Sequence, residues 1–252
     1  MILMLAGEGK TDMGQMILHS EGWVFEPGPM AWMVDHLLAP QMGYSLIENH
    51  LSGAECICYV SETDLAAQAK STANKKSTRL PGLKWGKNTG YFNRNAQVLG
   101  LLALHKQLEN QTPVLAVLFR DADASRSTSQ REWQDKWESI QRGFEMAQFG
   151  AGVPMVPRPK SEAWLLCALR QGYQHCNNLE EAPGNDDSPQ ALKIQLENWL
   201  GYRPAANEQI EWVRTLRVDP QRILMPSFLV FKQALAKAAA YNGFPQKRQL
   251  EM

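Results

Sequence analysis

The stretch that decides the fold is Val114-Leu-Ala-Val-Leu-Phe119, which runs directly into Arg120-Asp121-Ala122-Asp123. Six consecutive apolar residues without polar alternation predict a strand that is buried on both faces, as the strands of a parallel sheet are. Near the start of the chain, residues 2–6 have the same character, are closed by Gly7 and run into Glu8. Ligands bind at the carboxyl ends of strands in open α/β sheets, so the acids that follow these two strands are candidates for a functional site.

Helical and strand-like segments alternate on both sides of this stretch. Apolar residues at helical spacing predict helices at residues 30–42, 93–108, 129–148 and 161–170, and shorter apolar runs predict strands at 44–50 and 152–156. We expect Ser161 to cap the last of these helices. The alternation predicts an α/β fold in which a mainly parallel sheet is flanked by helices.

The expected core covers residues 1–175 and contains a basic loop insertion at about 65–94. Residues 180–188 are acidic and contain Pro183 and Gly184, a composition typical of a linker or long loop. A C-terminal helical region is expected at 188–252, with helices at 190–200, 207–216 and 227–241.

The composition is that of a globular, neutral protein. The chain has 252 residues, of which 44% are hydrophobic, and its 26 basic residues balance its 26 acidic ones. We find no targeting segment and no apolar run long enough to span a bilayer, so a cytoplasmic protein without membrane contact is expected. The cysteines lack C-x-x-C spacing and are expected to be reduced and structural, and the histidines lack the spacing of a zinc site.

One segment is strongly basic although the whole chain is neutral. Residues 65–108 contain no Asp or Glu, and aromatic residues lie among their cations, which favours contact with the phosphates and bases of DNA or RNA. The alternative is a solvated loop whose aromatic residues pack beneath it. The residues predicted to bind nucleic acid are Lys75, Lys76, Arg79, Lys84, Trp85, Lys87 and Arg94, with Tyr91 and Phe92 as further aromatic candidates.

The acids at the strand ends have the pattern of a divalent-metal site. Asp121 and Asp123 are two residues apart, so an extended backbone directs both carboxylates to the same side. Glu8 follows the first strand, and Asp12 comes one helical turn later. Hard oxygen ligands and room for a phosphate suit Mg²⁺ or Mn²⁺. Each acid also has a plainer interpretation, because Asp is common in turns and helix caps, and Glu in a first helical turn complements the helix dipole.

Three motifs carry a family resemblance. They are Ala6-Gly7-Glu8-Gly9-Lys10-Thr11-Asp12, then Phe119-Arg120-Asp121-Ala122-Asp123, then Pro157-Arg158-Pro159-Lys160-Ser161-Glu162-Ala163-Trp164. Together they resemble the Toprim domain of topoisomerases, bacterial primases and OLD (overcoming lysogenization defect) nucleases. The third motif is similar to the Glu-x-Trp helix start of compact stand-alone Toprim proteins related to the nuclease half of OLD nucleases.

The resemblance implies roles for single residues. Glu8 would act as general acid/base or metal ligand, Asp121 and Asp123 would bind metal, Asp12 and Glu162 would support them, and Lys160 would offset charge on the scissile phosphate. The implied activity is Mg²⁺- or Mn²⁺-dependent cleavage of DNA or RNA, in phage or mobile-element defence and with an ATPase partner protein.

Other functions compete with this one. Gly9-Lys10-Thr11 mimics the end of an NTPase P-loop, but Met4 occupies the position where that motif requires glycine. An aspartyl-phosphate phosphatase would place its Asp after the first strand, where this chain has Glu8. A glycosyltransferase using Asp121-x-Asp123 ranks third. A non-catalytic Toprim-like module that binds a partner protein or nucleic acid is the main alternative to a nuclease.

Overall fold

The structure is a computed structural model that describes residues 1–8, 12–20, 22–73, 90–122, 128–170 and 172–245. Its main sheet has four parallel strands in the order β4 (Ile57–Ser61), β1 (Ile2–Gly7), β5 (Val114–Phe119) and β6 (Gly152–Met155). Every residue of β1 and β5 is buried, as their continuous apolar sequences predicted. The expectation of an α/β fold with a parallel sheet flanked by helices is confirmed.

The ends of the two central strands lie very close together. Gly7 pairs with Phe119 in the register of β1 and β5. A Cβ on Gly7 would lie 3.0 Å from the Phe119 Cβ and 3.2 Å from its carbonyl oxygen, tighter than ordinary contact. The absence of a side chain at Gly7 therefore lets the segments that follow both strands start side by side.

The prediction of a strand at residues 44–50 is wrong. Those residues lead into helix α2 (Leu46–Leu51), whose start is capped by Ser45 and by the buried Asp35. The Ser45 Oγ accepts from the Glu48 amide at 3.0 Å, and the Asp35 carboxylate accepts from the amides of the first two helical residues. Because these caps satisfy the first helical amides, they favour a helix over a strand. The strand lies instead at β4, a half-buried edge strand with a short apolar run from Ile57 to Val60.

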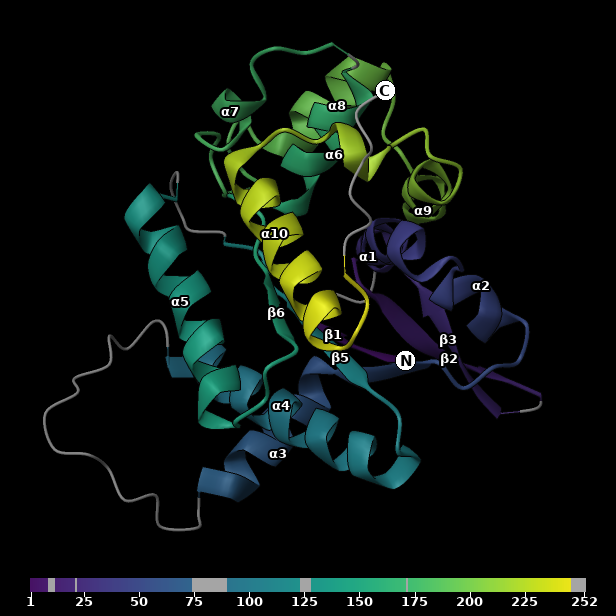
Figure 1. Cartoon of the computed structure of the whole chain (residues 1–252). Helices are drawn as coiled ribbons and strands as arrows, with labels where there is room; N and C mark the ends of the chain where they lie inside the picture. The colour runs from purple at the N-terminus through teal and green to yellow at the C-terminus, as the bar shows by residue number, and fades with distance from the viewer. Residues whose placement is uncertain (9–11, 21, 74–89, 123–127, 171, 246–252) are drawn as a thin grey trace, which may run out of the picture.

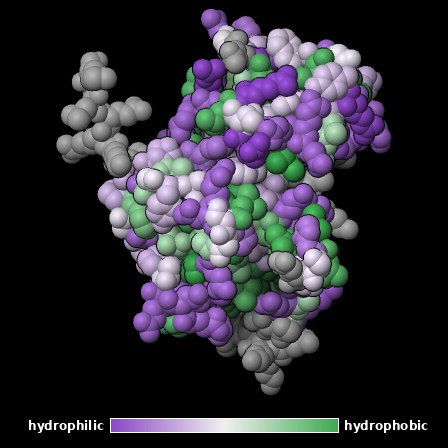
Figure 2. All heavy atoms as spheres, turned by 90° about the vertical axis from the view of Figure 1, so that its right-hand side faces the viewer, coloured by the Kyte–Doolittle hydropathy of each residue, from purple (hydrophilic) through white to green (hydrophobic). Residues whose placement is uncertain are grey.

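A β-hairpin was not predicted. Strands β2 (Gly14–His19) and β3 (Gly22–Pro27) form an antiparallel pair outside the main sheet. Near its tip Leu18 pairs with Trp23, and these residues are 63% and 65% exposed. Figure 2 views the molecule from the side on which the hairpin lies and shows hydrophobic residues among hydrophilic ones at the surface. Because apolar residues lie on both faces of the hairpin, its strands lack the alternation of apolar and polar residues by which a strand is recognised in a sequence.

Two groups of helices flank the sheet (Figure 1). Helix α4 packs on both α3 and α5, and α1 packs on α10. The bounds are α1 (Pro29–Met42), α3 (Glu62–Ala73), α4 (Gly90–Asn110), α5 (Gln130–Met146) and α10 (Pro226–Tyr241). The predicted helices therefore exist. The bounds predicted for the loop, 65–94, are wrong at both ends, because α3 continues to Ala73 and α4 starts at Gly90.

The remaining helices lie above the sheet in the view of Figure 1, beyond the carboxyl end of β6. They are α6 (Ser161–Leu169), α7 (Cys176–Leu179), α8 (Leu192–Leu200) and α9 (Ala206–Arg214), with a 3₁₀ turn at Pro220–Arg222. Their apolar side chains join one hydrophobic core with the residues of β1 and β5. No helix in the described part of the chain is long and apolar enough to cross a membrane.

The prediction that the cysteines are reduced is wrong for one pair. Cys167 in α6 and Cys176 in α7 form a disulfide, whereas Cys56 and Cys58 are thiols. The turn between α6 and α7 brings the two sulfurs together although their sequence spacing matches no known motif. Disulfides are typical of oxidising compartments, so the cysteines do not support a cytoplasmic location.

Candidate functional site

The candidate site lies where the order of the strands reverses. From β1 the chain continues to β4 on one side, and from β5 it continues to β6 on the other side. The crevice at such a switch point, beyond the carboxyl ends of the strands, is where open α/β sheets bind ligands. Glu8 directly follows β1 and Asp121 lies two residues beyond β5, so both predicted acids flank this point.

Glu8 is held by the segment that follows β5. Its Oε1 accepts from the Asp121 amide at 2.8 Å, and its Oε2 accepts from Arg120 Nη2 at 2.5 Å. Arg120 also donates to Glu62 of α3, with 3.1 Å between Nη1 and Oε1. The arginine is buried and bridges two acids, so it ties the end of β1 to the start of α3.

Two aromatic residues of α4 cover the arginine. The Arg120 guanidinium lies 4.5 Å from the centre of the Tyr91 ring and 5.4 Å from that of Phe92. Burial disfavours its charge, but Glu8, Glu62 and Tyr91 outweigh burial and raise the Arg120 pKa above its ordinary value. Tyr91 and Phe92 were predicted to stack on bases; here they stabilise a permanent cation in the site.

A single residue of α6 joins two further acids to the site. The Ser161 amide donates to Asp121 Oδ1 at 3.0 Å, and the Ser161 hydroxyl donates to Asp12 Oδ1 at 2.8 Å. The expectation that Ser161 is the N-cap is wrong: it is the first helical residue, and Lys160 is the N-cap without a side-chain hydrogen bond. Because Ser161 lies one position inside the helix, its hydroxyl is available to Asp12.

The acids gathered around Ser161 lie in surroundings that disfavour their ionised forms. Burial, followed by the charges of Asp12, Glu162 and Glu8, raises the pKa of Asp121 well above its usual value. Burial also raises the pKa of Asp12, against the Ser161 hydrogen bond and the charges of nearby lysines. The Glu162 pKa is raised by burial and by Asp12. We call Glu8, Asp12, Asp121 and Glu162 the carboxylate cluster.

Glu162 has a buried oxygen for which the described part of the chain offers no hydrogen-bond partner. Its Oε2 is inaccessible to solvent and unpaired there, while Oε1 lies 4.0 Å from Lys193 Nζ. Hydrogen bonding normally satisfies buried polar atoms, so this oxygen is suited to a ligand. Within the described ranges, however, no three His, Cys, Asp or Glu side chains are arranged to hold a metal ion as they stand.

Two lysines border the carboxylate cluster. Lys160 Nζ lies 2.8 Å from Asp186 Oδ1, and Lys193 Nζ lies 2.6 Å from Asp186 Oδ2. Lys160 was predicted from the third motif, but Lys193 and Asp186 were missed. They belong to α8 and to the connection before it, and their spacing from Lys160 matches no pattern that sequence analysis uses.

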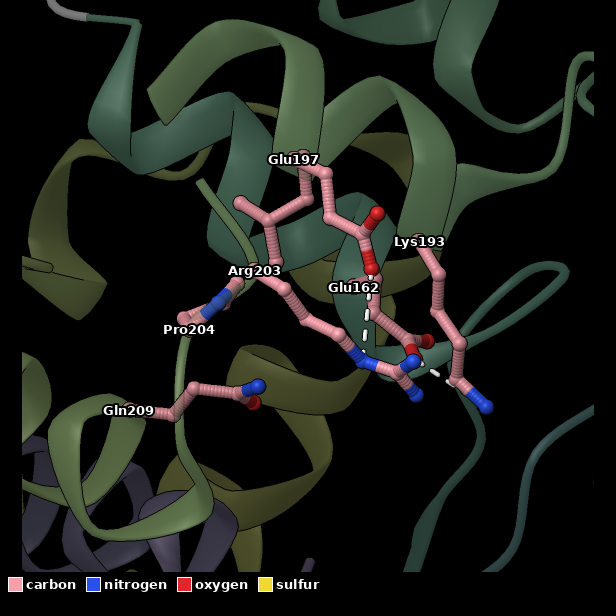
Figure 3. A pocket seen from close by; sticks show the side chains of 7 residues that line it. Glu162, Lys193, Glu197, Arg203, Pro204 and Gln209 are labelled. Carbon is pink, nitrogen blue, oxygen red and sulfur yellow. Dashed lines mark ion pairs between the residues drawn. The ribbon is translucent and has the colours of Figure 1, made fainter. Parts of the chain in front are cut away.

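A pocket adjoins the cluster on the side of α8 and α9. Figure 3 shows the Glu162 carboxylate with Lys193 on one side and Arg203 on the other. Arg203 Nε lies 3.5 Å from Glu197 Oε1, and the arginine side chain is 83% exposed. The remaining lining residues are Leu196, Pro204 and Gln209. This pocket therefore brings two cations of the C-terminal region next to an acid of the cluster.

Several predicted site residues lie outside the described residues. These are Asp123 and, in the basic segment, Lys75, Lys76, Arg79, Lys84, Trp85 and Lys87. Arg94 is described and is exposed on α4.

No family model, curated protein or solved structure matches the chain. The likeness to Toprim proteins consequently rests on the three motifs alone.

Proposed function

We propose that this protein is a Mg²⁺- or Mn²⁺-dependent phosphodiesterase that cleaves DNA or RNA with a Toprim-like site. The observation that supports it is the convergence of the carboxylate cluster, which comes from the ends of β1 and β5, from the segment before β2 and from α6. Like charges so arranged repel one another unless a proton or a cation neutralises them. Enzymes gather acids in this way to bind a metal.

The residues present fit a divalent cation. Their ligand atoms are carboxylate oxygens, which Mg²⁺ and Mn²⁺ prefer, and Glu162 Oε2 is a buried oxygen that has no hydrogen-bond partner among the described residues. Asp12, Asp121 and Glu162 would hold the ion, with Asp123 as a further ligand. A bound ion would polarise the phosphate and lower the pKa of a water.

The protein supplies the other groups that such a reaction needs. Hydrogen bonds from the Asp121 amide and Arg120 fix the position of Glu8, which suits it to exchange a proton with a water or leaving group. Ser161 fixes the relative positions of Asp12 and Asp121. Lys160, at the border of the cluster, would offset the negative charge of the bound phosphate backbone.

One observation favours a second function, that of a non-catalytic module binding nucleic acid or a partner protein. The Glu8 carboxylate forms a 2.5 Å ion pair with the buried Arg120, and an acid engaged in this way can be purely structural. Incubation of labelled DNA and RNA with Mn²⁺ separates the two functions. The enzyme predicts cleavage by the parent and none by Asp121→Ala, and the module predicts binding without cleavage by either.

A matched control makes this experiment decisive. Asp187→Ala removes an acid from an exposed loop position, and we expect it to cleave like the parent. Loss of activity in Asp121→Ala then counts only if circular dichroism shows an unchanged fold. Cleavage by purified Asp121→Ala at the parent's rate would refute the proposed enzyme. A role in phage defence with an ATPase partner belongs to the same proposal through the family resemblance, and the cytoplasmic location that the sequence predicted stays a proposal beside it.

A further inference from the structure

The contact between Asp186 and two lysines is unlike the other ion pairs of the site. One carboxylate bridges Lys160 and Lys193, with each lysine on a different oxygen, at 2.8 and 2.6 Å. Partial burial opposes ionisation of Asp186, yet the two hydrogen bonds lower its pKa below the usual value. A phosphate would present the two lysines with oxygens of the same charge in a similar arrangement.

The bridge lies beside the carboxylate cluster. The charges of both lysines act on Asp12 and on Glu162 and partly offset the rise in the pKa of each that burial causes. Lys193 also lines the pocket with Glu162 and Arg203 (Figure 3). A phosphate bound between the lysines would therefore lie next to the phosphate at the cluster, and Arg203 lies on the same side.

We propose that Lys160 and Lys193 bind a backbone phosphate of the nucleic-acid strand adjacent to the scissile one, and that Asp186 occupies this phosphate site until the strand displaces it. The proposal rests on the proposed function, because it names residues that hold the strand at the same site. It also gives the C-terminal region a role, since Lys193 belongs to α8.

The exposure of the three side chains permits this exchange. Asp186 and Lys193 are 45% and 48% exposed, so water can solvate the Asp186 carboxylate once it leaves the lysines, whereas Lys160 is only 13% exposed and stays in place. Ion pairs at such exposure are weak, each being worth a factor of about two to five in an equilibrium constant. Removing Asp186 should therefore strengthen phosphate binding on the order of tenfold, since two such pairs compete with the ligand.

The experiment measures binding of fluorescent single-stranded DNA and RNA oligonucleotides in EDTA, so that no metal and no cleavage contribute. We expect Asp186→Asn to bind about tenfold more tightly than the parent, and Lys193→Gln to bind more weakly. We expect the double variant to bind more tightly than Lys193→Gln, because Lys160 is no longer blocked, but to gain less from the loss of Asp186 than the parent does, because only one lysine remains. Inorganic phosphate should compete more effectively with the oligonucleotide in Asp186→Asn.

Two controls separate a specific site from general charge effects. Asp187→Asn removes the same charge from the neighbouring exposed position, and Lys237→Gln removes a lysine from the distant helix α10. Equal gains for Asp186→Asn and Asp187→Asn, or equal losses for Lys193→Gln and Lys237→Gln, would overturn the proposal. Tighter binding by Asp186→Asn together with no cleavage by the parent in Mn²⁺ would support the phosphate site while refuting the phosphodiesterase.

Discussion

Replacing Asp121 with Asn should stabilise the protein when no metal is bound. The substitution keeps the shape and an acceptor for the Ser161 amide, but it removes one negative charge from the carboxylate cluster. The cost of that charge is visible in the raised pKa of Asp121, which burial and three neighbouring acids cause. We therefore expect the neutral variant to unfold at a higher temperature than the parent in EDTA at pH 7.

The size of the effect follows from the geometry around Ser161. Its amide lies 3.0 Å from Asp121 Oδ1 and its hydroxyl 2.8 Å from Asp12 Oδ1. The two carboxylate oxygens are thus within about 9 Å, where unit charges repel by about 2 kcal/mol at an effective dielectric constant near 20. The neutral side chain of the variant accepts a weaker hydrogen bond from the Ser161 amide, and this loss offsets about 1 kcal/mol of the gain. The net gain of about 1 kcal/mol corresponds to about 2–4 °C in Tm for a chain of this length.

The gain should also depend on pH. Since the Asp121 pKa is higher in the folded than in the unfolded chain, the folded state holds the proton more tightly. The free energy of unfolding of the parent then falls as pH rises from about 4, the ordinary Asp value, through the folded-state pKa. Asn cannot titrate, so the advantage of the variant should be absent near pH 4 and fully present above the folded-state pKa.

Differential scanning calorimetry in EDTA, repeated between pH 4 and 8, measures both effects. Asp135→Asn serves as control, because it removes an exposed acid of α5 away from the cluster. The reasoning is refuted if Asp121→Asn is no more stable than Asp135→Asn at pH 7, or if its advantage is the same at pH 4.

Four further predictions test other parts of the structure. Millimolar Mn²⁺ should raise the Tm of the parent but not of Asp121→Ala, since a ligand that binds only the folded state stabilises it; no shift for the parent would contradict the metal site. Gly143→Ala should lower the free energy of unfolding, measured in urea, by about 1–3 kcal/mol, because the added Cβ would lie 2.2 Å from a backbone oxygen of α4. Gly90→Ala is the control: an added Cβ there meets no described atom within 4 Å, so the change should be neutral or stabilising. Replacing the lysines within residues 74–89 by alanine should lower the affinity for DNA or RNA. It should also flatten the dependence of that affinity on salt, by about one unit of slope for every phosphate that is no longer neutralised. An unchanged slope would mean that the segment is a solvated loop. Cys167→Ser should lower Tm and remove the effect of dithiothreitol on it, because the disulfide limits the unfolded chain; an equal response of parent and variant to the reductant would argue against the bond.

The strands and helices with strong local signals were predictable from the sequence. Strands β1 and β5 are buried on both faces, so their apolar runs are continuous, and α5 buries apolar residues such as Trp133 and Trp137 at helical spacing. Strand β4 was missed because its apolar run is only four residues long and follows residues 44–50, where the strand was expected instead. Residues 44–50 form a helix because caps from Ser45 and Asp35 outweigh their strand-like composition. The hairpin has exposed apolar residues, which no burial argument anticipates.

The site was predictable only where strand ends determine it. The rule for parallel sheets predicted that Glu8 and Asp121 lie close together, and the hydrogen bond from the Asp121 amide to the Glu8 carboxylate agrees with it. Asp12 was predicted from its position one helical turn after Glu8, and Glu162 came from the family resemblance. Their approach to Asp121 could not be predicted, because it depends on how Ser161 enters α6. The partners Arg120 and Asp186 could not be predicted, since ion pairs between distant segments follow from tertiary packing and leave no spacing in the sequence.

The position of β1 between β4 and β5 has a consequence for the order of folding. Glu8 and Asp121 are far apart in the chain, so closing the site requires a long loop whose entropy is lost before any favourable interaction forms. The acids repel one another as they approach, so their meeting contributes nothing favourable to a folding nucleus. Burial of the apolar residues of β1 and β5 must instead drive the pairing of the two strands, and this pairing brings the acids together. Kinetic experiments should therefore find that substitutions of the cluster acids change the unfolding rate and leave the refolding rate nearly unaffected.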